Sequence, residues 1–213
     1  LYLRMSRLMH EILGQYSDKV ESFGLDESWV EISADDMDVR KGQLVADEIR
    51  HRIHRTLGIT VSVGVADNKV MAKLGSDYKK PDATTVIDRS NYKEIAWPLP
   101  VSDLLYAGKK TTEALARIGI RTIGDLAACE KSTVSALLGE SGIQLWLYAK
   151  GLDNAPVRSY YDREESKSIG NGMTFRRDTA GEEEVRAGVM ALTDSVAARL
   201  READLKCTVV QVQ

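Results

Sequence analysis

One short segment constrains the fold more than any other, because apolar and small side chains alternate strictly from residue 59 to residue 66. The apolar set is Ile59, Val61, Val63 and Val65, and the other set is Thr60, Ser62, Gly64 and Ala66. Successive side chains of a strand point to opposite faces, so this alternation predicts a β-strand with one face in a core. The small residues on the second face leave room for a close neighbour.

Helical and extended patterns alternate on both sides of this strand. Helical periodicity or capping covers residues 1–16, 38–57 and 67–76, and strand-like runs cover 20–25, 29–33 and 84–87. Such an order predicts an α+β fold with a split βαβ arrangement, in which helices cover one face of a sheet.

The pattern changes after residue 88. Pro98 and Pro100 mark a boundary, and residues 102–150 are helical in short pieces, one of them opening with a capping box at 122–125. The polar segment 158–167 has the composition of a linker. A strand, the helix 182–203 and a second alternating strand then predict a β-α-β unit whose sheet is incomplete.

Composition excludes some classes and leaves function open. The net charge is −3, and none of the three parts of the chain is basic overall, so any nucleic-acid site must rest on local geometry. No run of 18 apolar residues exists that could form a membrane helix. Cys129 and Cys207 lack partners at metal-binding spacing, which indicates reduced packing thiols in a cytoplasmic protein. The chain opens on Leu1 rather than Met, and we expect the natural chain to start earlier.

The residues with the clearest chemistry are Asp26 and Glu27, an acidic pair at the turn of an apolar hairpin. At a tight turn both carboxylates can converge on one point, where their repulsion favours a divalent cation. Hard oxygen ligands suit Mg²⁺, which takes one or two carboxylates together with waters and substrate phosphates. The alternative for an isolated pair is that it only solvates the turn.

Three motifs in order carry a resemblance to a known family. Residues 24–31 resemble the palm motif Ser-Ile-Asp-Glu-Ala-Tyr-Leu-Asp of the translesion DNA polymerases of the Y family, the DinB/UmuC-like type. Residues 61–74 resemble the strand-to-helix signature of the same polymerases, and 76–82 resemble their Ser-Asp…Lys-Pro segment. The resemblance covers nearly the whole chain. It implies a palm over 1–87, built on an antiparallel sheet with helices, and an all-α thumb over 88–157. A linker over 158–167 and the first part of a β-α-β little finger over 168–213 would follow.

The resemblance also implies a reaction and its residues. A polymerase of this family extends a primer by nucleotidyl transfer with two Mg²⁺ ions. Asp26 would bridge both ions, Glu27 would bind the catalytic one, and Lys80 would bind the triphosphate of the incoming dNTP. Lys69 and Lys73 share a helix face, where they either contact phosphate or are solvated. Glu31 matches an acidic position of the family, although a structural role on the strand is equally compatible with its place.

Some of the family's parts have no counterpart in this sequence. The family's first palm strand carries a third metal-binding Asp and an aromatic steric gate, and its fingers grip the triphosphate. Two carboxylates from one turn are too few to hold two octahedral ions. We therefore expect the isolated 213-residue fragment to be inactive. The sliding-clamp peptide of the family is expected only in the full-length protein.

Two further segments are expected to hold primer-template DNA, damaged or not. Residues 101–120 resemble a helix-hairpin-helix, in which Gly108 supplies the turn, Lys109 and Lys110 add charge, and Gly119 ends the helix. Tyr106 stands where the usual hairpin has its first glycine, and an ordinary helical turn remains an alternative. The start of the little finger offers donors for the template backbone, namely Ser168, Thr174, Arg176 and Arg177.

Some features leave alternatives open. Trp97, Trp146 and Tyr148 could stack on bases, but their spacing is more typical of the thumb core. A non-catalytic DNA-binding module predicts no metal site at Asp26 and Glu27. A nucleotidyl cyclase also pairs carboxylates on a hairpin, but the thumb-like segment and the Lys-Pro motif argue against it. The best interpretation is a bacterial, cytoplasmic polymerase with no membrane segment.

Overall fold

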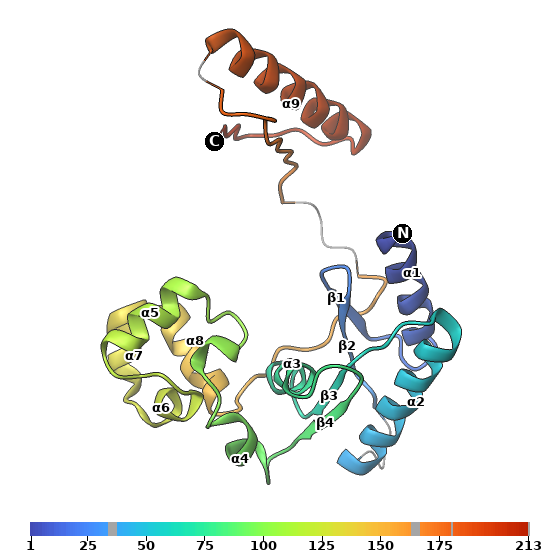
Figure 1. Cartoon of the computed structure of the whole chain (residues 1–213), viewed down its shortest axis with the longest axis vertical. Helices are drawn as coiled ribbons and strands as arrows, with labels where there is room; N and C mark the ends of the chain where they lie inside the picture. The colour runs from blue at the N-terminus through green and yellow to red at the C-terminus, as the bar shows by residue number, and fades with distance from the viewer. Residues whose placement is uncertain (34–37, 163–166, 180, 213) are drawn as a thin grey trace. The chain divides into compact units, whose positions relative to one another are not determined.

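The computed structural model describes residues 1–33, 38–162, 167–179 and 181–212. The chain divides into two compact units, residues 1–162 and 163–213. Both α-helices and β-strands are present, which confirms the mixed class (Figure 1). None of the described helices is long and apolar enough to cross a membrane.

Within residues 1–33 and 38–87, which the structure describes, there are three helices and four short strands. In chain order they are α1 (Tyr2–Leu13), β1 (Val20–Phe23), β2 (Glu27–Val30), α2 (Val39–Leu57), β3 (Val63–Ala66), α3 (Lys69–Tyr78) and β4 (Thr84–Ile87). β1 and β2 form an antiparallel hairpin, and β3 pairs with β4 in parallel (Figure 1). The expectation of an antiparallel palm sheet is therefore wrong for the second pair. The chain returns from β3 to β4 through α3, and such a crossover makes the two strands parallel.

The alternating segment 59–66 forms a shorter strand than expected, because only its last four residues pair with β4. Ile59 and Val61 pack instead against the core between α1, β1 and α2. The close neighbour predicted for the small-residue face is confirmed at Gly64. A Cβ atom there would lie 1.8 Å from the carbonyl oxygen of Ala72, so α3 can approach the strand only because Gly64 has no side chain.

The next segment is helical in short pieces. Its elements are α4 (Tyr92–Ala96), η1 (Val101–Asp103), α5 (Lys109–Arg117), α6 (Ile123–Ala128), α7 (Lys131–Leu138) and α8 (Glu140–Ala149). The capping box between Thr122 and Asp125 is present as predicted. One core joins these helices to α3 and β4, and Trp97, Trp146 and Tyr148 pack in it, which confirms their structural role. The first 87 residues and the helical segment that follows thus share one core.

The second unit contains the helix α9 (Glu182–Glu202), which matches the predicted helix closely. In the described parts of 167–179 and 205–212 the structure has no strand, so the β-α-β unit is not confirmed beyond its helix. A strand needs a hydrogen-bonded neighbour, and alternation alone does not supply one. Within the expected linker 158–167, residues 163–166 lie outside the described residues. Cys129 packs against the core as expected, whereas Cys207 is exposed and is not a packing thiol.

Candidate active site

The acidic pair lies on the hairpin β1–β2, but the turn is placed differently from the prediction. Residues 24–26 form the turn, and Gly24 adopts a φ of 78°, which a glycine reaches without strain. Asp26 is exposed at the end of this turn, whereas Glu27 is the first residue of β2 and pairs with Phe23. The two neighbours therefore belong to different local structures, one to a turn and one to a strand.

A chain of alternating charges leads from Glu27 along α3. The ammonium of Lys73 lies 2.8 Å from Glu27 Oε1 and 2.7 Å from Asp77 Oδ2. The other oxygen of Asp77 lies 2.6 Å from the ammonium of Lys80. The order Glu27–Lys73–Asp77–Lys80, which we call the charge ladder, connects the predicted metal ligand to the predicted triphosphate ligand.

The charge ladder is partly buried, and its ion pairs shift the pKa values of its two middle residues, Lys73 and Asp77. The side chain of Lys73 is only 18% exposed, so of its two predicted alternatives, phosphate contact or a solvated face, the solvated one is wrong. Burial favours the neutral amine, but hydrogen bonds to Asp77 and Glu27 outweigh it, and the pKa of Lys73 is raised. Burial would likewise raise the pKa of Asp77, yet Lys73 and Lys80 together lower it. Both residues are therefore charged at neutral pH.

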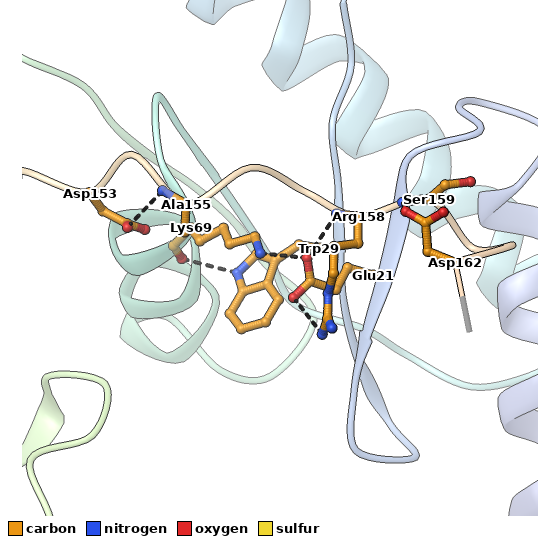
Figure 2. A network of polar contacts seen from close by, with 8 residues as sticks. All are labelled: Glu21, Trp29, Lys69, Asp153, Ala155, Arg158, Ser159 and Asp162. Atoms are coloured by element: carbon orange, nitrogen blue, oxygen red, sulfur yellow. Dashed lines mark hydrogen bonds and ion pairs between the residues drawn. The ribbon is translucent and has the colours of Figure 1, made fainter. Parts of the chain in front are cut away.

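A second network, which the sequence did not reveal, holds α3 against the hairpin (Figure 2). The carboxylate of Glu21 in β1 pairs with the ammonium of Lys69, the first residue of α3. The indole N–H of Trp29 donates to the Lys69 carbonyl at 3.0 Å. The backbone N–H of Arg158 donates to Glu21 Oε2 at 2.9 Å, and its guanidinium lies 3.3 Å from Oε1. Glu21 thus binds both α3 and the segment that follows α8.

Burial and hydrogen bonding compete at Glu21. Burial would raise the pKa of this carboxyl, but hydrogen bonds from Lys69 and from the Arg158 amide outweigh it, so the pKa is lowered. The sequence offered one signal for this site: Glu21 is a charged residue within a strand-like run, next to Val20, which is buried in the structure. Glu31 accepts from Lys19 at 2.5 Å, which favours the structural one of its two predicted roles.

The hairpin is also held from the side of α1. His10 is buried, and its Nδ1 lies 2.7 Å from the Ser6 carbonyl oxygen. Its Nε2 lies 2.8 Å from Ser22 Oγ and 2.9 Å from Ser28 Oγ, two residues that face each other across the hairpin. The strands beside the acidic turn are therefore fixed to two helices.

The thumb loop before α5 differs from the prediction in one respect. Gly108 is the N-cap of α5 with a φ of −67°, which any residue adopts, so the expectation that Gly108 supplies the turn is wrong. Tyr106 adopts the left-handed conformation instead, with a φ of 69°, at the position where the family has its first glycine. Lys109 and Lys110 are exposed in the first turn of α5, and Gly119 follows its end with a φ of 86°.

The four residues predicted to line the template lie in the second unit. Ser168, Thr174, Arg176 and Arg177 are all exposed. The guanidinium of Arg177 lies 3.4 Å from Glu184 Oε1 on α9. The unit therefore offers these side chains to solvent, and their role with DNA stays a prediction.

The chemistry of the hairpin fits a hard divalent cation. Asp26 and Glu27 supply carboxylate oxygens, and an ammonium already lies beside Glu27, which shows that a cation can reach that oxygen. Among the described residues no group of three or more His, Cys, Asp or Glu side chains could hold a metal ion. An ion here would take its other ligands from water and phosphate oxygens.

Family models and curated proteins match the sequence over most of its length. The sequence model described as the impB/mucB/samB family matches residues 1–77, and that of the impB/mucB/samB family C-terminal domain matches residues 166–213. DNA polymerase IV of Acetivibrio thermocellus is 47% identical over 212 residues, which are 100% of this chain and 53% of the relative. DNA polymerase IV 1 of Bacillus subtilis is 38% identical over 207 residues, 96% of this chain and 49% of the relative. The chain spans about half the length of these curated relatives.

Solved structures share the fold. A Y-family DNA polymerase chimera of Dbh and Dpo4 has a TM-score of 0.79 at 22% identity and covers 92% of this chain and 57% of its own. The insertion ternary complex of Dbh DNA polymerase has a TM-score of 0.67 at 25% identity, over 73% of this chain and 46% of its own. The arrangement of helices and strands is therefore that of these polymerases.

Proposed function

The chain belongs to the impB/mucB/samB family, a DinB-type group of Y-family DNA polymerases, and from this premise we propose that it is part of a translesion DNA polymerase. Its proposed parts are the palm (1–87), the thumb (88–157), the linker (158–167) and the first part of the little finger (168–213). The complete protein would extend a primer on a damaged or undamaged template. Its substrates would be primer-template DNA and dNTP, in the bacterial cytoplasm, with a sliding clamp as partner.

The observation that carries this proposal is the charge ladder from Glu27 to Lys80. It links a carboxylate suited to a metal, in β2, to an exposed lysine suited to phosphate, just after α3, through two side chains of α3. A nucleotidyl transfer site needs both groups within the reach of one triphosphate.

Each residue has a separate task in this reaction. Asp26 and Glu27 would hold Mg²⁺ in the complete enzyme. Bound Mg²⁺ supplies Lewis acidity that lowers the pKa of the primer 3′-hydroxyl and neutralises charge on the phosphates. Lys80, whose side chain is 55% exposed, would bind triphosphate oxygens as a mobile point charge.

DNA would be held without reading its sequence. The first turn of α5 presents backbone N–H groups next to the exposed Lys109 and Lys110, an arrangement that favours a phosphate after Gly108. In the second unit the template backbone would be contacted by Ser168, Thr174, Arg176 and Arg177. Backbone contacts give affinity without base preference, which suits the copying of damaged templates.

Primer extension tests the proposal. A chimera would join this chain to the N-terminal and C-terminal segments of the Acetivibrio thermocellus relative, and it would be compared with its Glu27→Ala and Glu31→Ala variants. We expect Mg²⁺-dependent extension by the chimera, loss of at least about a hundredfold with Glu27→Ala, and little change with Glu31→Ala. The isolated chain should extend no primer. Equal activity of the Glu27→Ala variant would overturn the proposal and favour a non-catalytic DNA-binding module.

A further inference from the structure

We propose that Lys73 and Asp77 form an ion-pair exchange that couples the arrival of a divalent cation at Glu27 to the release of Lys80 for the triphosphate. The inference rests on the proposed function of Glu27 and Lys80, and it assigns positioning roles to two residues that carry none in that proposal. The exchange is built into the charge ladder on α3.

Lys73 is the cation that Glu27 holds before any metal binds. Its ammonium is shared between two carboxylates, Glu27 at 2.8 Å and Asp77 at 2.7 Å. Only 18% of this side chain is exposed, so water screens the two contacts weakly. A lysine ammonium and a divalent cation compete for the same oxygen, because like charges a few ångströms apart repel each other.

Asp77 divides its two oxygens between two lysines. Oδ2 accepts from Lys73 and Oδ1 accepts from Lys80 at 2.6 Å. When a divalent cation binds Glu27, Asp77 becomes the only partner of Lys73 on the ladder. The ion pair between Lys73 and Asp77 then becomes stronger. The pair between Asp77 and Lys80 weakens in consequence.

Lys80 is the end of the ladder that can leave most easily. Its side chain is 55% exposed, and exposed ion pairs contribute little stability. Lys73 and Asp77 also line an open hollow together with residues 102–108, so the middle of the ladder faces space that a ligand can enter. The cation and the triphosphate would therefore arrive at two ends of one neutral chain of charges.

Binding of Mn²⁺ to the 213-residue chain, measured by electron paramagnetic resonance, tests the first half of the exchange. Lys73→Met removes the competing cation and should tighten binding at least about threefold. Asp77→Asn leaves Glu27 as the only carboxylate of the ladder that pairs with Lys73. Lys73 then competes more strongly for Glu27, so Mn²⁺ binding should weaken by a similar factor. The matched control is Lys79→Met, which removes an exposed lysine at the end of α3 and should leave the affinity unchanged. A purely structural role would weaken binding in both ladder variants.

The release of Lys80 is measured by acetylation with acetic anhydride and mass spectrometry. Adding Mg²⁺ alone should raise the acetylation rate of Lys80 about twofold or more relative to Lys79, and Lys73→Met should abolish this rise. An unchanged rate, or weaker Mn²⁺ binding by Lys73→Met, would overturn the exchange while leaving the proposed function intact. Unchanged Mn²⁺ affinity in Glu27→Gln would instead overturn the metal site itself, and the exchange with it. Circular dichroism spectra would confirm that each variant is folded.

Discussion

Glu21 and Lys69 form an ion pair behind the acidic turn, although 48 residues separate them in the sequence. Their side chains are only 9% and 11% exposed. Lys69 is the first residue of α3 and lies one helical turn before Lys73. This pair therefore fixes the helix that carries the charge ladder against the hairpin that carries Glu27.

Breaking this pair should destabilise the fold. Lys69→Met leaves the buried carboxylate of Glu21 with Arg158 as its remaining cation, and we expect a loss of about 3 kcal/mol in the free energy of unfolding. Urea denaturation followed by circular dichroism measures it. The control is Lys19→Met, which removes the exposed partner of Glu31 and should cost less than about 1 kcal/mol. Equal losses would show that burial of the Glu21 pair is unimportant.

The same carboxylate predicts a pH dependence. The pKa of Glu21 is lowered in the folded state, so ionised Glu21 stabilises the fold above the ordinary pKa of 4.5. This contribution is lost as the pH falls through the lowered value. The stability difference between wild type and Glu21→Gln should thus be constant at neutral pH and shrink below pH 4.5. A difference that grows on acidification would mean that the sign of the shift is wrong.

The loop before α5 should tolerate changes at Tyr106 and Gly108, the two positions where the hairpin motif has its glycines. Gly108→Ala should change the stability by less than about 0.5 kcal/mol, because its φ is −67° and no atom lies within 4 Å of the added Cβ. Tyr106→Gly relieves a left-handed tyrosine and should be neutral or stabilising by up to about 1 kcal/mol. Thermal unfolding measures both. A large loss of thermal stability with Gly108→Ala would contradict this and show that Gly108 forms the turn after all.

The lysines of α5 should contribute to duplex DNA affinity independently of the DNA sequence. In the chimeric polymerase, Lys109→Ala and Lys110→Ala should each weaken binding equally for unrelated sequences and reduce the slope of log affinity against log salt by about 1. Fluorescence anisotropy at several salt concentrations gives both values. Lys131→Ala, at the start of the neighbouring helix α7, is the control and should change neither. Losses of affinity that differ between DNA sequences would contradict binding to the DNA backbone alone.

Local patterns predicted those parts of the fold that depend on neighbouring residues. The alternation over 59–66 located β3 and its close contact with α3, and Thr122 with Asp125 located a helix start. Asp26 and Glu27 were predicted as metal ligands because an acidic pair at an apolar hairpin is unusual, and this role stays a prediction. Such signals lie within one turn of a helix or one pair of strands.

Features that depend on distant partners were not accessible in the same way. The sequence left phosphate contact and solvation open for the lysines of α3, since nothing local indicates that Lys69 meets Glu21 or that Lys73 meets Glu27. The left-handed φ of Tyr106 is imposed by the surrounding loop rather than by its own preference. The strands expected beside α9 failed for a related reason, because a strand is defined by a partner that alternation does not identify.

The central claim is that Asp26 and Glu27 bind a divalent cation. The most direct test is a titration of the ¹⁵N-labelled chain with Mn²⁺, in which paramagnetic broadening reports the distance of each amide from the ion. We predict that the amides of Asp26 and Glu27 broaden first, and that the double variant Asp26→Asn, Glu27→Gln loses this effect. Broadening that begins elsewhere, or that persists in the double variant, would contradict the account.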